Sequence, residues 1–172
     1  MQNLDPNKLK FKTYDPTIDS LSDLDFSQND GSDPLLVDQY VKCNLSKGIV
    51  RDNYKIYIVK YEGSIIAFFT LSMSVICSNN LCDDEKDLKN FIYPALLMGK
   101  IGIDKKYRCF KIGNYICLYC LGLAQKTNEK IACSFFVFRT TQSLAEKIYG
   151  PKYYFRWRNT SSKIVRVYRR II

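Results

Sequence analysis

The pattern of hydrophobic and polar positions predicts an alternation of strands and helices along the chain. Residues 8–14 alternate between apolar and polar and are typical of a strand. Two β-rich runs on either side of Glu62-Gly63 predict a hairpin over residues 54–76. Apolar runs bounded by turn residues predict further strands at 93–104, 130–140, 153–158 and 163–171.

Three segments have helical spacing instead. The first begins at Ser32 or Asp33, with Pro34 at the first helical position and Gly48 as its end. Its apolar side chains fall on one face: Leu35, Leu36, Tyr40, Val41 and Leu45. Residues 111–127 predict an apolar helix and residues 141–150 a short one, whereas the polar insertion at 78–92 is expected to be a mobile loop.

The order of these elements, β-α-β-β-β-α-β-α-β-β, predicts an α/β fold with a mixed sheet. A chain of 172 residues that is 47% hydrophobic can bury one core, so a single domain over residues 1–172 is expected. In an α/β architecture the ligand is expected at a strand-to-helix turn.

Cysteine and histidine usage restricts the chemistry. The chain has seven Cys and no His, which excludes Cys–His and Ser–His–Asp mechanisms. Four cysteines in apolar contexts predict reduced, packed thiols: Cys43, Cys117, Cys120 and Cys133. The alternative is a four-Cys zinc site from Cys77, Cys82, Cys117 and Cys120. Its first spacing is loose and its second pair belongs to a buried helix face, so no metal is expected.

Charge is unevenly distributed in a chain with a net charge of +9. Residues 1–40 hold eight Asp and three Lys, whereas residues 150–172 hold seven Lys and Arg and no acid. A basic tail suits a polyanion such as nucleic acid, although a merely basic surface is the alternative. The sequence shows neither a bilayer-length apolar run nor a signal-peptide pattern, so a soluble, cytoplasmic protein without a membrane partner is expected.

The basic segment "DKKYRCFK" lies between the strand at 93–104 and the helix at 111–127. The first N–H groups of a helix have no intrahelical partner, and the helix dipole favours anions there. Arg108 and Lys111 add positive charge, and Gly113 permits close approach of a ligand. The segment therefore predicts a pyrophosphate site, with a solvated basic turn as the alternative.

At this loop the sequence resembles the GNAT superfamily of acetyltransferases, whose signature is Gln/Arg-x-x-Gly-x-Gly/Ala. "DPLLVDQYVKCNL", "IIAFFTLSMSVI", "YPALLMGKIGIDKKYRCFKIGNYI" and "SLAEKIY" follow, in order, the pattern of the GNAT-type toxins of toxin–antitoxin modules. Two departures stand out. Lys111 replaces the first signature Gly, and "IYGPKYYF" lacks the usual Gly-Phe.

The resemblance implies a GNAT fold of six to seven strands with flanking helices and an acetyl-CoA cleft at splayed central strands. The implied acid that protonates the thiolate is Tyr149. The strand backbone that would hold pantetheine and the thioester is that of Ile101, Gly102 and Ile103. The implied pyrophosphate loop and helix start comprise Arg108, Cys109, Phe110, Lys111, Ile112, Gly113 and Asn114.

The acceptor is expected to be an amine, because no Glu in the strand at 98–104 can serve as a base. An α-amino group, with a pKa of about 7.7–8.0, is partly neutral at pH 7, unlike Lys at about 10.4. With alternate side chains sharing a strand face, two basic stripes are expected: Arg156 with Arg158, and Arg166 with Tyr168 and Arg170.

These features, with the toxin resemblance, suggest aminoacyl-tRNA as the acceptor, bound by Arg156 and Arg158. Protein N-termini, small amines and a non-catalytic CoA-binding or nucleic-acid-binding module are the alternatives. An antitoxin partner and a homodimer are further expectations.

Overall fold

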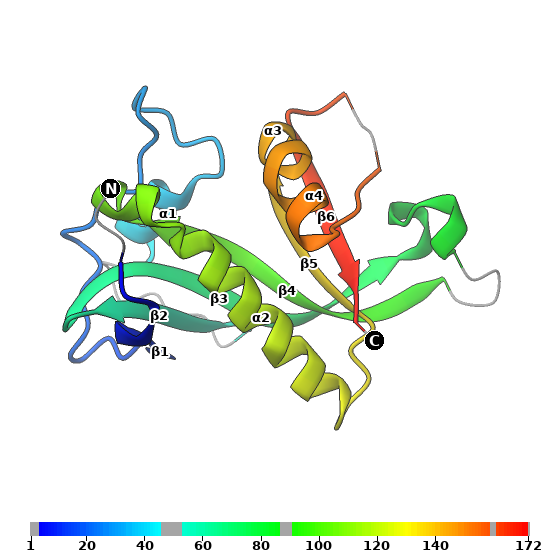
Figure 1. Cartoon of the computed structure of the whole chain (residues 1–172), viewed down its shortest axis with the longest axis horizontal. Coiled ribbons are helices and arrows are strands. Elements are labelled where there is room, and N and C mark those ends of the chain that lie inside the picture. Colours follow the sequence, from blue (N-terminus) through cyan, green and yellow to red (C-terminus); the bar gives the residue numbers. More distant parts are fainter. Residues whose placement is uncertain (1–3, 46–52, 87–90, 159–160, 172) are drawn as a thin grey trace. The chain divides into compact units, whose positions relative to one another are not determined.

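The computed structural model describes residues 4–45, 53–86, 91–158 and 161–171 (Figure 1). The chain divides into two compact units, each with its own core. Unit 1 comprises Met1–Leu71 and Lys100–Cys117, and unit 2 comprises Ser72–Gly99 and Leu118–Ile172. The expected single domain stays a prediction.

Six strands form one mixed sheet in chain order, which confirms the predicted α/β class. The strands are β1 (Leu9–Thr13), β2 (Lys55–Tyr61), β3 (Ser64–Cys77), β4 (Ile92–Ile103), β5 (Phe135–Thr141) and β6 (Ile164–Arg170). The helices are α1 (Val37–Cys43), α2 (Ile112–Asn128), α3 (Gln142–Leu144) and α4 (Gly150–Tyr153).

The predicted hairpin is confirmed. Strand β2 pairs with β3 in antiparallel fashion, and Tyr61 lies opposite Ser64 across the turn. Glu62 and Gly63 both have positive φ angles, 49° and 90°. That is the backbone of a type I′ turn, whose twist matches the twist of the strands on either side.

The core of unit 1 lies between β2, β3, α1 and the segment before α1. Phe26 packs edge-on against Phe68 with ring centroids 5.1 Å apart, and Tyr40 of α1 stacks on the same Phe68 ring at 6.2 Å. The buried cluster contains Leu21, Phe26, Val37, Val41, Leu45, Ile56, Ile58 and Phe68.

Helix α1 begins at Val37, so the predicted start at Ser32 or Asp33 is wrong. The Asp33 carboxylate accepts hydrogen bonds from the N–H groups of Val37 at 2.7 Å and Gln39 at 3.1 Å. Leu36, directly before the helix, is left-handed at φ 53°. Asp33 therefore caps the helix from four residues away. The predicted end at Gly48 lies outside the described residues.

A buried carboxylate ties the N-terminal segment of unit 1 to its sheet. Asp19 lies between the ammonium groups of Lys12 at 3.0 Å and Lys60 at 2.9 Å, and it accepts the Asp15 N–H. Burial opposes the charged form of Asp19, but these hydrogen bonds outweigh it and hold its pKa below the usual value. An ion pair within the fold thus replaces water around the acid.

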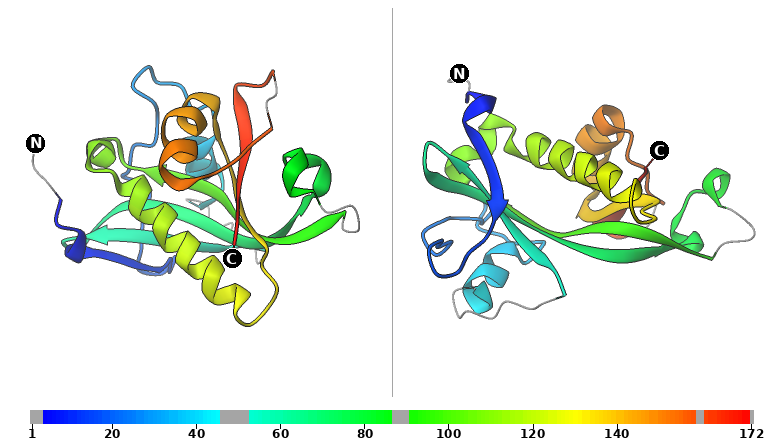
Figure 2. Two further views of the ribbon diagram at one scale, coloured as in Figure 1. Left: turned by 45° about the vertical axis from the view of Figure 1, so that its right-hand side comes forward. Right: turned by 90° about the horizontal axis from the view of Figure 1, so that it is seen from below.

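Unit 2 is built around the strand pairs β4–β5 and β5–β6. Residues 95–98 of β4 run parallel to residues 135–138 of β5, and β5 is antiparallel to β6, gold and red in Figure 2. Phe135 packs edge-on against both Tyr93 and Tyr168 at the centre of this core. Strand β5 starts at Phe135, so the predicted start at 130 is wrong.

The predicted helix at 141–150 is confirmed, but it is composite and longer than expected. Helix α3 passes into a π-helical turn, Ala145–Tyr149, and then into α4. The helix therefore takes up Tyr153, and left-handed Tyr154, at φ 57°, ends it.

The strand predicted at 153–158 is wrong for that reason. Arg156 alone makes a β-bridge, to Tyr168, through N–H···O distances of 2.8 and 2.9 Å. The alternating aromatic and basic residues of this segment instead form the end of a helix and an irregular segment after it.

The polar insertion predicted as a mobile loop contains two 3-10 turns in its described part, Ser78–Asn80 and Asp83–Glu85. Between them, the Cys82 N–H donates to the hydroxyl oxygen of Tyr168 at 2.6 Å. The insertion is thus tied to β6 of the same unit.

Cys117, Cys120 and Cys133 are buried, as expected, but Cys43 is exposed, which corrects the prediction for that residue. Within the described ranges, His, Cys, Asp and Glu side chains form no group that could hold a metal ion. In the same ranges, no helix has the length and apolar character needed to cross a membrane.

Candidate active site

The loop between β4 and α2 is fixed at its start by Asp104. This buried residue donates its N–H to the Ile66 carbonyl at 2.9 Å, and its carboxylate accepts the Lys106 N–H at 2.9 Å. The 3-10 turn Lys105–Phe110 follows directly. The basic segment is therefore an ordered turn rather than an open loop.

Within β4, the structure gives Gly102 a packing role. A Cβ at this position would lie 2.5 Å from Cε1 of Phe68 and 2.7 Å from Cδ1 of Phe26. Gly102 thus lets two aromatic rings reach the strand backbone. The predicted contacts of Ile101, Gly102 and Ile103 with pantetheine stay predictions.

Lys111 joins the 3-10 turn to α2 in the left-handed conformation, with φ 60° and ψ 25°. This is the position at which the GNAT signature has its first Gly. Glycine adopts this backbone without strain, whereas other L-residues pay roughly 1–2 kcal/mol. The chain thus keeps the backbone that a glycine would favour and places an exposed Lys side chain on it.

The first turn of α2 is anchored on one side and open on the other. Ile112 is fully buried, and the Asn114 N–H donates to the Lys111 carbonyl at 2.9 Å. Gly113 is half-buried; a Cβ there would lie 3.5 Å from Cδ1 of Ile103, an ordinary contact. Since α2 is 17 residues long, its dipole favours an anion at this end.

Arg108 is held at the end of β4, where its Nε donates to the Ile103 carbonyl at 3.3 Å. Asp25, which has hydrogen bonds from Ser27, also lies near Lys105 and Arg108, and these groups together lower its pKa. Phe110 packs its ring against Tyr107 at 6.1 Å, and Cys109 is exposed. The residues of the predicted pyrophosphate loop therefore do lie together, within unit 1.

Tyr149 ends the π-helical turn of unit 2. Its ring packs edge-on against Phe138 of β5, with centroids 4.8 Å apart, and against Phe155 at 6.0 Å. Its carbonyl accepts the Phe155 N–H at 3.1 Å. A π-helical turn often marks a functional position, and here aromatic packing fixes the orientation of the ring.

Comparison with known proteins shows the fold. No protein-family model matches the sequence, and no curated protein sequence matches it. Solved structures of bacterial toxins match along nearly the whole chain. A Tyr-to-Phe mutant of KacT superposes with a TM-score of 0.74 at 12% identity, over 95% of each chain.

The AtaT–AtaR pair bound with acetyl-CoA gives a TM-score of 0.72 at 12% identity, over 96% of this chain and 95% of the other. AtaT complexed with acetyl-methionyl-tRNAfMet gives 0.72 at 12%, over 91% and 92%. The chain has the fold of the GNAT-type toxins.

On this toxin fold, the basic tail departs from the sequence-based expectation. Arg156 makes a bidentate ion pair with Asp84, with two N–O distances of 2.7 Å. Arg158 donates to the Asn79 carbonyl at 2.8 Å. Because residues 153–158 are not a strand, no strand face aligns Arg156 with Arg158, and their predicted role in substrate binding stays a prediction. In β6, Arg166 and Arg170 are exposed on either side of buried Tyr168.

The acids that pair with the tail were missed by sequence reasoning, because they lie about 70 residues earlier in the chain. The only available signal was composition: "DDE" at 83–85 is the single acidic run near the polar insertion.

The strain at Lys111 predicts a stabilising substitution. Lys111→Gly is expected to raise the free energy of unfolding by about 1 kcal/mol, because glycine adopts the left-handed conformation freely. Lys106→Gly, inside the neighbouring 3-10 turn, is the control and is expected to destabilise. Chemical denaturation of both variants measures the difference. A Lys111→Gly variant with a lower free energy of unfolding would show that contacts of the Lys side chain outweigh the backbone strain at this junction.

Proposed function

We propose that this chain is an acetyl-CoA-dependent N-acetyltransferase and that its acceptor is the α-amino group of an aminoacyl-tRNA. The observation that carries the proposal is the left-handed junction at Lys111. It lets α2 begin directly after the turn that contains Arg108. The fold is shared with a toxin whose structure contains acetyl-CoA. Pyrophosphate is the anion that such a turn binds well, through backbone N–H groups, a helix dipole and a guanidinium.

The cofactor is proposed to lie along the end of β4 and the start of α2. The backbone of Ile101, Gly102 and Ile103 would hold pantetheine and the thioester. The pyrophosphate would rest on the N–H groups of Ile112 and Gly113, next to Asn114, with Arg108 and Lys111 supplying charge and Cys109 and Phe110 completing the turn.

The proposed reaction transfers an acetyl group from sulfur to nitrogen. The neutral amine attacks the thioester carbonyl, a C–N bond forms and the C–S bond breaks. The amine loses a proton to water, and the Tyr149 phenol gives a proton to the thiolate and regains one from solvent. No residue needs to act as a strong base, since an α-amino group is already partly neutral at pH 7.

Aminoacyl-tRNA is the acceptor that best combines these features. AtaT, which shares the fold, is known in complex with acetyl-methionyl-tRNAfMet, and this chain carries seven cations and no acid in residues 150–172. Arg156 and Arg158 are proposed to contact its phosphates. AtaT and AtaR form a toxin–antitoxin pair, and by analogy a small antitoxin partner is proposed for this chain.

Gly113→Asp is expected to abolish acetyl-CoA binding, because it places bulk and negative charge against the pyrophosphate. Calorimetry of the folded variant measures the affinity. Two controls are available in the same helix. Gly113→Ala makes only an ordinary contact with Ile103, and Gly122→Asp adds the same charge where a Cβ would meet no atom within 4 Å. Both should bind acetyl-CoA, and unchanged affinity in Gly113→Asp would end the loop assignment.

Tyr149→Phe keeps the ring packing on Phe138 and removes the acidic proton. Turnover should fall by about 10²–10⁴-fold with little change in acetyl-CoA affinity. The matched control is Tyr154→Phe, which removes an exposed hydroxyl five residues later and should leave turnover intact. Steady-state release of CoA thiol measures both. A Tyr149→Phe enzyme that works at the parent rate reduces Tyr149 to a packed aromatic.

The acceptor is tested by incubating the enzyme with labelled acetyl-CoA and, separately, charged tRNA, uncharged tRNA, free peptides and polyamines. Label should enter charged tRNA alone, should leave with the amino acid when the ester is hydrolysed, and should decline steeply with salt. Label in peptides or polyamines but never in charged tRNA would refute the tRNA acceptor and leave the acetyltransferase. Binding without turnover on any amine would instead indicate a CoA-binding module.

A further inference from the structure

Two arginines of the basic tail contact one short acidic turn of unit 2, and a third, Arg158, contacts the 3-10 turn that precedes it. The turn is part of the polar insertion and contains Asp83–Glu85. Arg156 binds Asp84 through two N–O contacts of 2.7 Å and reaches Glu85 at 3.2 Å. Arg170 donates to the Glu85 carbonyl at 3.2 Å, and Arg158 donates to the Asn79 carbonyl at 2.8 Å.

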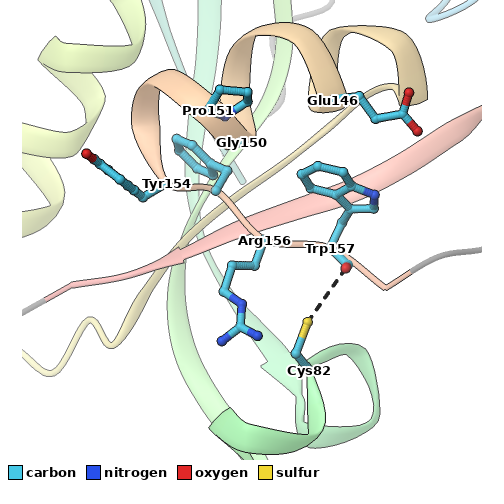
Figure 3. A pocket seen from close by; sticks show the side chains of 8 residues that line it. Cys82, Glu146, Gly150, Pro151, Tyr154, Arg156 and Trp157 are labelled. Atoms are coloured by element: carbon cyan, nitrogen blue, oxygen red, sulfur yellow. Dashed lines mark hydrogen bonds between the residues drawn. The ribbon is translucent and has the colours of Figure 1, made fainter.

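Arg156 and Cys82, the residue before the acidic turn, also line a pocket of about 660 Å³ (Figure 3). The Arg156 side chain extends toward the turn that carries Cys82, and the Cys82 thiol donates to the Trp157 carbonyl at 3.6 Å. The segment 156–158 and the acidic turn are therefore joined by polar contacts. The other residues that line the pocket are Glu146, Gly150, Pro151, Tyr154 and Phe155, together with Trp157.

The contact of Arg156 with Asp84 has the geometry with which arginine binds a phosphate. A guanidinium presents two parallel N–H groups that match two oxygens of a carboxylate or of a phosphate equally well. The hydrogen bonds that Arg156 donates to Asp84 raise the pKa of Arg156 and lower the pKa of Asp84. Both groups are charged at neutral pH, and the Asp84 carboxylate offers Arg156 two anionic oxygens, as a phosphate does.

This ion pair is also accessible to a competing anion from solvent. The side chains of Arg156 and Asp84 are 40% and 66% exposed, and ion pairs in contact with water contribute little to stability. Arg170 is held from the other side by the Phe135 ring, with the guanidinium carbon 4.9 Å from the ring centroid. Arg170 thus has a contact that does not depend on the acidic turn.

We propose that Arg156, Arg158 and Arg170 form an RNA phosphate-binding surface that the chain's own acidic turn occupies until RNA displaces Asp84. The choice of RNA rests on the proposed function; the competition between Asp84 and a phosphate rests on the contacts alone. The turn discriminates against weak anions, because a ligand must replace a bidentate carboxylate to bind. An RNA backbone can replace the carboxylate because its successive phosphates bind several arginines at once.

The test uses the full chain and a fluorescein-labelled, uncharged RNA hairpin with a single-stranded 3′ end, without acetyl-CoA. Asp84→Asn removes the competing charge and keeps the shape of the side chain. It should tighten RNA binding roughly two- to tenfold, measured by anisotropy. It should also increase the salt dependence by about one phosphate contact.

Asp83→Asn is the matched control. It changes the net charge equally, but Asp83 pairs with Lys86 rather than with Arg156 and acts on Arg158 only through its charge, so its gain should be smaller. Arg156→Gln should weaken binding, and adding it to Asp84→Asn should remove the gain. Trp157, the only Trp of the chain, should change its emission when unlabelled RNA displaces Asp84.

Equal gains in Asp84→Asn and Asp83→Asn, weaker binding by Asp84→Asn, or no RNA binding by any variant would overturn the inference. Circular dichroism confirms that each variant is folded. The outcome is separate from that of the acetylation assay. If charged tRNA is never acetylated but Asp84→Asn tightens binding through Arg156, the proposed acceptor fails and the surface stands.

Discussion

The candidate cofactor loop depends on one backbone junction, at Lys111. Its left-handed conformation ends the 3-10 turn Lys105–Phe110 and allows α2 to begin at once. Buried Asp104 fixes the turn at one end, and buried Ile112 fixes the helix at the other. Because both ends are fixed, residue 111 is restricted to the left-handed conformation. The packing of the residues on either side offsets the strain of a non-glycine residue there.

The same residue shows why a sequence signature and a conformation are different things. In amino-acid identity, Lys111 departs from the GNAT pattern. In backbone conformation, it keeps the left-handed φ and ψ angles that glycine adopts without strain. Identity of only 12% with KacT and AtaT is compatible with a common fold for this reason. A common fold requires the same side-chain volume and backbone conformation at only a few positions. Gly102, which leaves room for Phe26 and Phe68, is one of them.

Local patterns were predictable from the sequence and distant pairings were not. The Glu62-Gly63 hairpin, β4, α2 and β6 follow from periodicity and turn residues that lie next to one another. The start of α1 was missed because Asp33 caps from four residues away. The segment 153–158 resembles a strand because its aromatic and basic residues alternate, whereas in the structure the helix through Tyr149 continues to Tyr153. The pairing of Arg156 with Asp84 joins residues 72 apart, which no local pattern encodes.

Two-dimensional NMR of the ¹⁵N-labelled protein, titrated with CoA and separately with pantetheine, tests the position of the cofactor most directly. If the pyrophosphate lies on the first turn of α2, CoA should shift the backbone amide resonances of Ile112 and Gly113 downfield. Pantetheine, which lacks the diphosphate, should leave them nearly unchanged. Equal shifts with both ligands, or CoA-induced shifts that spare these two amides, would contradict the assignment of this loop.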